Sequence, residues 1–160
     1  MPQGECFVAN VYDTARPYAA AYVLLERAGK VLFVLRENTR WMNGYYGLPS
    51  GKVERGEGFL AAAVREAKEE VGVVIVPADL EHVISFWRHE ADDPPDMEWC
   101  DVVFRAKAWQ GEPYNAEPDM HSEAAWFALD ALPQNTIPQT RDMIQAIVAG
   151  KNYGERGQKC

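Results

Sequence analysis

The stretch that decides the fold of this chain runs from Gly51 to Val73, with the sequence GKVERGEGFLAAAVREAKEEVGV. A glycine-rich turn opens it, and a run with helical periodicity follows and ends at Gly72, because glycine is the usual residue just past a helix. The apolar positions of this run fall on one stripe about 100° wide, formed by Leu60, Ala63, Val64, Ala67 and Val71. We therefore expect a helix from near Gly58 to Gly72 whose apolar stripe packs on a core.

Three glutamates, Glu66, Glu69 and Glu70, stand beside the apolar stripe at the spacing i, i+3 and i+4. Like charges at this spacing destabilise a helix by about 0.2–0.5 kcal/mol per pair, and the helix dipole disfavours anions near the C-terminal end. A bound cation removes this penalty, and Mg²⁺ and Mn²⁺ prefer carboxylate oxygens as ligands. The alternative is an acidic helix face exposed to solvent, with Arg65 and Lys68 as ordinary partners of the glutamates. If the three glutamates were the only observation, this alternative would be favoured.

The turn before the helix favours a metal site that faces a phosphate. Gly51, Gly56 and Gly58 allow backbone groups to approach a ligand closely and to take positive φ, and Pro49 stiffens the chain ahead of them. Glycines and clustered carboxylates in one stretch therefore indicate a divalent metal held against a diphosphate.

The same residues resemble the signature of the Nudix hydrolases, G-x5-E-x7-R-E-U-x-E-E-x-G-U, in which U is aliphatic. The matching positions are Gly51, Glu57, Arg65, Glu66, Ala67, Glu69, Glu70, Gly72 and Val73. Every fixed position is present, and only Ala67 is smaller than the usual aliphatic residue. The resemblance implies hydrolysis of a nucleoside diphosphate linked to another group, most simply a nucleoside tri- or diphosphate, with Mg²⁺ as the cofactor and Mn²⁺ as its substitute.

The resemblance also implies a division of roles among the motif residues. Glu66, Glu69 and Glu70 hold metal and orient the attacking water, and Glu66 corresponds to the usual base or ligand position of the family. Arg65 and Glu57 form the pair that holds the loop against the helix, which is an orienting role rather than proton transfer.

Further metal ligands are expected outside the helix. A carbonyl oxygen of Ser50 or Gly51 is a candidate to complete the metal shell. In resembling families an acid from a loop after the motif often completes the site or acts as the base, and Glu117, Glu112 and Glu98 are the candidates here. Spacing does not choose among these three acids, and we favour Glu117.

The loop at residues 37–50 delivers the chain to the motif and carries the candidates for substrate binding. Its aromatic side chains Trp41, Tyr45 and Tyr46 are suited to stacking on a base or to packing on the core, and we favour packing for Tyr46. Arg36 and Arg40 are within reach of a phosphate, although a lone arginine is more often a surface charge. We therefore expect Arg36, Arg40, Trp41 and Tyr45 at the substrate.

Length and composition predict a single domain over residues 1–160, with an N-terminal arm at 1–17 and a polar tail at 151–160. The chain is 48% hydrophobic and 25% charged, which is typical of a globular rather than a disordered protein. Its net charge of −8 argues against a broad nucleic-acid surface, so we expect a nucleotide-type small molecule as the substrate. Without a leader or a membrane-spanning apolar run, we expect a cytoplasmic monomer or homodimer with no membrane partner.

The cysteines and histidines are not spaced as a zinc site or a disulfide framework would require. They are Cys6, Cys100 and Cys160, and His82, His89 and His121. We expect reduced thiols and histidines that are structural or exposed.

The rest of the chain predicts strands before and after two helices. Residues 18–26 and 30–36 should form strands joined by a tight turn, and 31–35 is apolar throughout, as in a central strand covered on both faces. The further elements expected are a short strand at 73–76, a hairpin of 80–89 and 98–109 around the proline-containing loop 90–96, a strand at 124–129 and a helix at 137–149. This order implies an α/β (α+β) layered sandwich with a mixed β-sheet between helices, and the Nudix resemblance implies the same fold.

Two alternatives to a hydrolase stay open. One is a nucleotide-sensing or protein-binding Nudix domain without turnover, although such a domain has no need to keep clustered like charges. The other is an enzyme similar to a prenyl diphosphate isomerase, for which Cys100 beside Trp99 is a weak candidate as the catalytic cysteine.

Overall fold

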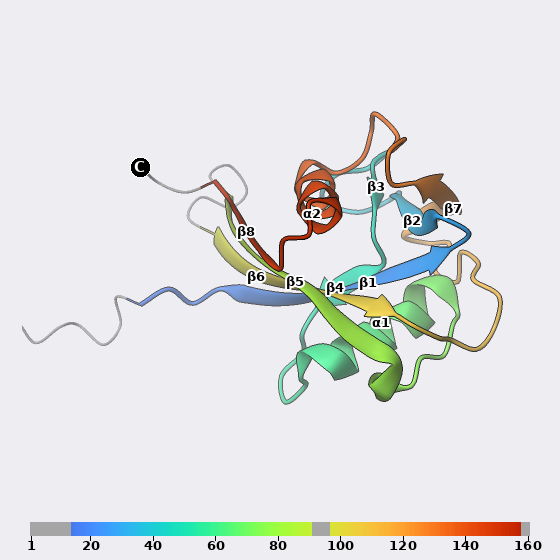
Figure 1. The fold of residues 1–160 in the computed structure, drawn as a ribbon, viewed down its shortest axis with the longest axis horizontal. Helices are drawn as coiled ribbons and strands as arrows, with labels where there is room; N and C mark the ends of the chain where they lie inside the picture. The colour runs from blue at the N-terminus through green and yellow to red at the C-terminus, as the bar shows by residue number, and fades with distance from the viewer. Residues whose placement is uncertain (1–13, 91–96, 158–160) are drawn as a thin grey trace, which may run out of the picture.

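The computed structural model describes residues 14–90 and 97–157. The elements in chain order are β1 (Tyr18–Arg27), β2 (Lys30–Arg36), β3 (Tyr46–Gly47), β4 (Ser50–Lys52), α1 (Phe59–Val71), the short 3-10 helix η1 (Pro77–Asp79), β5 (Leu80–Glu90), β6 (Met97–Ala106), β7 (His121–Ala128), α2 (Pro138–Val148) and β8 (Tyr153–Arg156). Helices α1 and α2 lie on opposite sides of the strands (Figure 1). The predicted layered sandwich with a mixed sheet is confirmed.

The strands form two groups, which are joined where β1 and β2 pair at the turn of their hairpin. Strands β1 and β2 are paired at Glu26–Val31 and Arg27–Lys30, next to a tight turn in which Ala28 and Gly29 both have positive φ. Beyond this turn β2 pairs with β3 and β7, whereas β1 pairs with β4 and, in parallel, with β6. The two groups therefore diverge away from the hairpin.

Alternate residues of β1 pack in two separate hydrophobic cores, because successive side chains of a strand point to opposite faces. Ala21, Val23 and Leu25 pack in one core with α1, and Ala20, Tyr22 and Leu24 pack in the other with α2. The α1 side chains in the first core are Ala62, Ala63, Ala67 and Val71, and the α2 side chains in the second are Met143 and Ile144.

Helix α1 is turned differently from the predicted wheel. Leu60, expected on the buried stripe, is 42% exposed, and this prediction is wrong. Ala62 is fully buried in its place, and Glu66 and Glu70 are 9% and 6% exposed. The buried face is thus rotated toward the glutamates, whose carboxylates have polar partners: the Ser50 amide of β4 donates to Glu70, and Arg65 donates to Glu66.

Other boundaries differ at short polar or isolated segments. The strand expected at 73–76 is reduced to one bridge between Val74 and Gln110. The tail predicted at 151–160 contains β8, which pairs in parallel with β5; four residues at a sheet edge carry too little hydrophobic pattern to signal a strand. Residues 1–13 of the expected arm and residues 91–96 of the expected loop lie outside the described residues.

The expected strands at 18–26 and 30–36 and the helices ending near 72 and 149 are present in β1, β2, α1 and α2. The antiparallel pairing expected of 80–89 with 98–109 is present in β5 and β6, but it ends at Ala106 rather than at residue 109. Over the described ranges 14–90 and 97–157, no helix is both long and apolar enough to cross a bilayer.

Candidate active site

Helix α1 presents its glutamates to the segment that precedes it. The Ser50 backbone amide in β4 donates a hydrogen bond of 2.9 Å to Glu70 Oε2. Gly51 leaves no room for a side chain, since a Cβ there would lie 1.9 Å from Glu66 Oε1. β4 thus passes directly over the buried carboxylates, and Gly51 allows its backbone to approach the Glu66 carboxylate closely.

The glycines of the turn have distinct conformations. Gly56 has φ of 83°, as expected, and Gly72 caps α1 in the left-handed region with φ of 71°. The positive φ expected of Gly51 and Gly58 is wrong: neither has positive φ, and Gly58, with φ of −103°, is the N-terminal cap of α1 in extended backbone.

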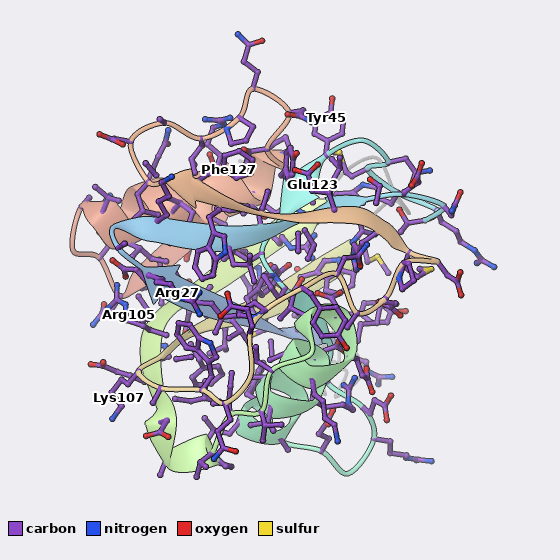
Figure 2. All side chains as sticks on the ribbon, turned by 90° about the vertical axis from the view of Figure 1, so that its right-hand side faces the viewer. Arg27, Tyr45, Arg105, Lys107, Glu123 and Phe127 are labelled. Carbon is purple, nitrogen blue, oxygen red and sulfur yellow. The ribbon has the colours of Figure 1, made fainter. Side chains whose placement is uncertain are left out.

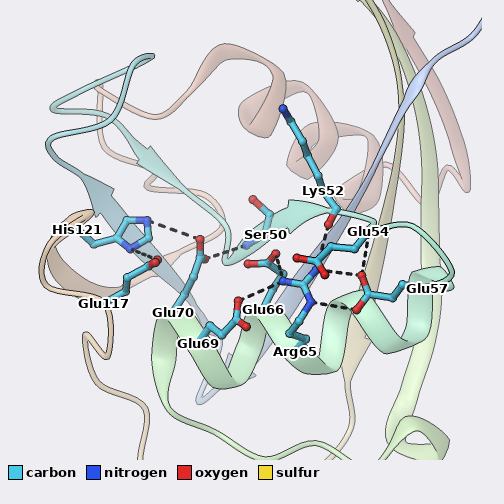
Figure 3. Close-up of polar contacts among 10 residues, drawn as sticks. All are labelled: Ser50, Lys52, Glu54, Glu57, Arg65, Glu66, Glu69, Glu70, Glu117 and His121. Carbon is cyan, nitrogen blue, oxygen red and sulfur yellow. Dashed lines mark hydrogen bonds and ion pairs between the residues drawn. The ribbon is translucent and has the colours of Figure 1, made fainter.

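Arg65 connects the loop that precedes α1 to the helix through several hydrogen bonds (Figure 3). Its guanidinium binds both carboxylate oxygens of Glu57, at 2.9 and 3.0 Å, and also donates to the Lys52 carbonyl at 3.0 Å. Another nitrogen donates to Glu66 at 2.6 Å and to Glu69 at 3.1 Å. The bonds to Arg65 hold the pKa of Glu57 below its usual value, and the same contacts raise the pKa of Arg65.

The loop before β7 and the first residue of β7 bring the Glu117 and His121 side chains to the end of α1. The Ala116 amide donates to the Glu70 carbonyl at 2.9 Å, and the Asn115 side chain donates to the His121 carbonyl at 2.7 Å. One ligand atom each from Glu70, Glu117 and His121 therefore lies within 4.8 Å of the others. Figure 3 shows His121 between the two carboxylates.

Burial affects the pKa values of the glutamates and the histidine in this group. His121 is 2% exposed, and its ring nitrogens lie 3.7 Å from Glu70 and 3.6 Å from Glu117, too far for hydrogen bonds. Its Nδ1 is buried without a hydrogen-bond partner, and burial, with the charge of Arg36, lowers the pKa of His121 to about 4. Burial also raises the pKa of Glu66, Glu70 and Glu117, and neighbouring carboxylates add to each rise.

These donors fit a divalent cation. Clustered carboxylates that burial and mutual repulsion disfavour are stabilised by positive charge, and their oxygens suit Mg²⁺ and Mn²⁺. A neutral, buried imidazole with an unpartnered nitrogen is a potential ligand as well. The expectation that His121 is only structural or exposed does not account for this position, and the only local signal of it is the four-residue spacing from Glu117 in a segment that forms no helix.

The three candidate acids that follow the motif, Glu98, Glu112 and Glu117, lie in different parts of the structure. Glu117 lies in the group with Glu70, as favoured. Glu112 instead accepts a hydrogen bond of 2.6 Å from Arg27 at the hairpin end of β1, a region shown with Arg27 labelled in Figure 2. Glu98 lies in β6 opposite His89 in β5, outside the group around Glu70.

A pocket of about 560 Å³ opens on the α2 side of β1 and reaches the motif through Ser50, Gly51 and Glu70. Its other described lining residues are Ala20, Tyr22, Val34, Arg36, Trp41, Met42, Gly47, Leu48, Lys52, Arg88, Trp99, Ile137, Pro138, Gln139, Thr140 and Arg156. A volume of this size accommodates a nucleoside, because ligand pockets typically measure about 300–1,000 Å³.

Two of the four residues predicted to contact substrate line this pocket. Arg36 donates to the Trp41 carbonyl at 3.1 Å, and its guanidinium lies 5.6 Å from the centre of the Trp41 ring. Arg40 is exposed and does not line the pocket. Tyr45 is 38% exposed and points outward in Figure 2, whereas Tyr46 packs edge-on against a core aromatic ring, as expected.

Sequence analysis missed the pocket residues contributed by distant segments. Trp99 of β6 has the Arg88 guanidinium 4.3 Å from its ring centre, the Lys52 ammonium at 5.5 Å and the Tyr18 ring at 5.1 Å. Figure 3 shows the Lys52 side chain pointing away from the motif carboxylates. Cys100, the candidate thiol of an isomerase, does not line the pocket, and burial raises its pKa, which disfavours the reactive thiolate.

Comparison with known proteins agrees with this architecture. A family model described as the NUDIX domain matches residues 15–147. A crystal structure of a MutT NUDIX hydrolase from Burkholderia pseudomallei superposes with a TM-score of 0.74 and 31% identity, over 82% of this chain and 98% of that one.

The names of the curated relatives indicate different substrates. The NAD-capped RNA hydrolase NudC of Pseudomonas aeruginosa is 31% identical over 90% of this chain and 47% of its own length. The ADP-ribose pyrophosphatase of Methanocaldococcus jannaschii is 34% identical over 74% of this chain and 66% of its own length. The human 8-oxo-dGDP phosphatase NUDT18 is 29% identical over 88% of this chain and 41% of its own length.

The chain therefore spans about half the length of several curated relatives it matches. The match covers the motif, both helices and the strands between them. Together with the complete motif on α1, it establishes that this chain belongs to the Nudix hydrolase family.

Proposed function

We propose that this domain hydrolyses a nucleoside diphosphate linked to another group, by attack of water on phosphorus, with Mg²⁺ as its cofactor. The observation that carries the proposal is the position of Glu70, which belongs to the buried acidic group and also lines the nucleoside-sized pocket. A substrate whose base occupies the pocket would place its phosphates at these carboxylates. The relatives named above, which act on nucleotide-linked groups according to their names, support this class.

The residues proposed to hold metal are Glu66, Glu69, Glu70 and Glu117, with a carbonyl oxygen of Ser50 or Gly51. A divalent cation, when bound, supplies neutralisation of phosphate oxygens and a lower pKa for water. His121 lies between Glu70 and Glu117 and is added to this set as a ligand or as a spacer that fixes the two carboxylates.

The other motif residues have positioning roles. Arg65 fixes the carboxylates of Glu66 and Glu69 and ties Glu57 to the helix, so it sets the directions from which oxygen atoms face the phosphate.

Glu66 is the proposed base that accepts the proton of the attacking water. The water oxygen bonds to phosphorus, and the bridging oxygen leaves with its electron pair as part of the second phosphate product.

Hydrolysis of a substrate panel tests the proposal. Purified protein with Mg²⁺ or Mn²⁺ is offered nucleoside triphosphates, nucleoside diphosphates, dinucleoside polyphosphates, nucleotide sugars and NADH, and phosphorus-containing products are followed by ³¹P NMR. We expect turnover of at least one class, and a loss of about 100-fold or more in Glu69→Gln and Glu70→Gln, because each removes charge that balances the metal. Glu112→Gln is the control, since this exposed carboxylate lies outside the site.

Absence of every phosphorus-containing product would refute the hydrolase. Tight nucleotide binding without turnover, measured by calorimetry, would instead establish the nucleotide-sensing domain. An equal loss in the Glu112→Gln control would show that carboxylate loss acts through general charge rather than through the site.

A further inference from the structure

His121 is a buried side chain that lies between two carboxylates at the end of α1. It is 2% exposed, and its Nδ1 has no hydrogen-bond partner among residues 14–90 and 97–157. Nδ1 faces Glu117 Oε2 at 3.6 Å, and Nε2 faces Glu70 Oε1 at 3.7 Å (Figure 3). Buried polar groups are normally hydrogen-bonded, so a nitrogen at this depth without a partner calls for a ligand.

The backbone of His121 is fixed on both sides of the ring. Its amide donates to the Glu117 carbonyl at 3.0 Å, and its carbonyl accepts from the Asn115 side chain at 2.7 Å. His121 also pairs with Arg36 in the ladder of β2 and β7, next to a shift of register. The position from which the imidazole extends is therefore set by the fold before any ligand arrives, as a preorganised site requires.

Glu70 is oriented toward the same point. Its Oε2 accepts from the Ser50 amide at 2.9 Å, which leaves Oε1 as the oxygen that faces His121. Arg65 donates to the two other motif carboxylates, those of Glu66 and Glu69. The motif carboxylates thus fall into two parts, and the part with Glu70 is the one that includes a ring nitrogen.

The distances in this group are those of ligands around an ion rather than of a direct ion pair. A protonated imidazole bonded to carboxylates would bring nitrogen and oxygen to about 2.7–2.9 Å. Bonds from a metal such as zinc to nitrogen and oxygen are about 2.0–2.2 Å long, so two ligand atoms on one ion are about 3–4 Å apart. The separations of 3.6 and 3.7 Å fall in this range.

The ligand types select the class of ion. Imidazole suits zinc and other transition ions, whereas Mg²⁺ is held by one or two carboxylates together with water and phosphate oxygens. A nitrogen ligand therefore adds affinity for transition ions and little for Mg²⁺. When one ring nitrogen binds an ion, the other faces the second carboxylate, which is the usual arrangement of a metal-bound histidine.

We propose that His121 is a metal ligand which, with Glu70 and Glu117, forms a position for a first-row divalent transition ion such as Mn²⁺, Co²⁺ or Zn²⁺ in preference to Mg²⁺. This inference rests on the metal group of the proposed function and specifies the class of ion that one part of it takes. It also goes beyond the Nudix signature, because His121 lies outside the stretch from Gly51 to Val73.

The first measurement is spectroscopic and uses the wild type without substrate. Chelator-treated protein is loaded with Mn²⁺ below saturation, and electron spin-echo envelope modulation detects nitrogen nuclei coupled to the ion. The chain has three histidines, and protein labelled with ¹⁵N only in histidine identifies their nitrogens. We expect an imidazole coupling that changes with the histidine label. Absence of this coupling in the wild type overturns the inference.

Variants assign the coupling to one histidine. His121→Gln should abolish it and should lower the affinity for Co²⁺ and Zn²⁺ relative to Mg²⁺, measured by calorimetry, by about 10-fold or more. A histidine that only spaces the two carboxylates would leave this ratio unchanged. His82→Gln is the matched control, because it removes an exposed histidine bonded to Ser85, and it should keep both the coupling and the ratio.

Thermal melts show whether each variant is folded. If His121→Gln does not fold, retention of the coupling in both His82→Gln and His89→Gln assigns it to His121 by elimination. Loss of the coupling in either of these two variants, or its persistence in folded His121→Gln, overturns the assignment.

The outcomes also distinguish this inference from the proposed function. Hydrolysis with Mg²⁺ by a protein whose bound Mn²⁺ shows no imidazole coupling overturns the transition-ion position and leaves the hydrolase standing. A coupling that depends on His121, without hydrolysis of any substrate in the panel, supports the position and overturns the proposed function.

Discussion

The replacement of Glu70 by glutamine distinguishes a metal site from a structural carboxylate. Glu70 is 6% exposed, accepts a hydrogen bond from the Ser50 amide and lies among the carboxylates of Glu66 and Glu117. Glutamine keeps an oxygen acceptor for the Ser50 amide and removes the buried charge. We expect metal-free Glu70→Gln to unfold with a free energy equal to or above that of the metal-free wild type.

The effect of metal gives the prediction its magnitude. A ligand present at 100 times its Kd stabilises a protein by about 2.7 kcal/mol, which for a chain of this size corresponds to about 5–11 °C in Tm. The wild type should show a rise of this order as Mg²⁺ or Mn²⁺ is added. Glu70→Gln should lose most of the rise, because it removes a buried charge from the proposed ligand set.

Thermal melts of chelator-treated protein, titrated with MgCl₂ and with MnCl₂, measure both quantities. Glu112→Gln, which removes a carboxylate bonded to Arg27 away from the site, should shift with metal as the wild type does. A metal-induced rise in Glu70→Gln as large as in the wild type would refute the site. A metal-free Tm far below that of the wild type would show that Glu70 is a structural group.

Three further changes test other parts of the structure. Gly51→Ala would place a methyl group 1.9 Å from the Glu66 carboxylate, so kcat should fall by at least about 10-fold with the helix still folded by circular dichroism. Arg65→Lys exchanges a fork bonded to three glutamates and a carbonyl for a point charge, and urea unfolding should show a loss of about 1–3 kcal/mol. Burial and the hydrogen bond to Glu123 raise the pKa of Tyr46 from 10.0 to about 12. The stability from this tyrosine is therefore full below pH 10 and lost as the pH rises through about 12, which melts of wild type and Tyr46→Phe against pH will show as a converging difference.

The parts of the fold carried by local pattern were predictable from sequence. The motif helix, the hairpin of β1 and β2, and the antiparallel pairing of β5 with β6 each follow from periodicity and turn residues within one stretch. The rotation of α1 was not, because the wheel ranks residues by hydrophobicity alone. Leu60 is exposed and Glu66 is buried, and the tertiary contact between Glu66 and the β4 backbone at Gly51 does not enter such a ranking.

The site residues that sequence reasoning missed come from segments far apart in the chain. His121 meets Glu70 across 51 positions only because hydrogen bonds tie the loop before β7 to the end of α1. Gln139 and Trp99 share a pocket because α2 and β6 both flank β1. No spacing rule within one segment encodes such meetings, whereas the motif glutamates lie within one stretch, where their spacing, the glycine turn and the resemblance to the Nudix signature together single them out.

The alternation along β1 has a consequence for protein engineering. Its even-numbered positions, Ala20 and Tyr22, line the pocket, while the intervening Ala21 and Val23 are fully buried against the α1 core. Ala20 and Tyr22 also pack in the α2 core, so libraries at these positions would sample new ligands only with substitutions that this core accommodates. Ala21 and Val23 do not line the pocket, so variation of these positions should lower stability without changing selectivity.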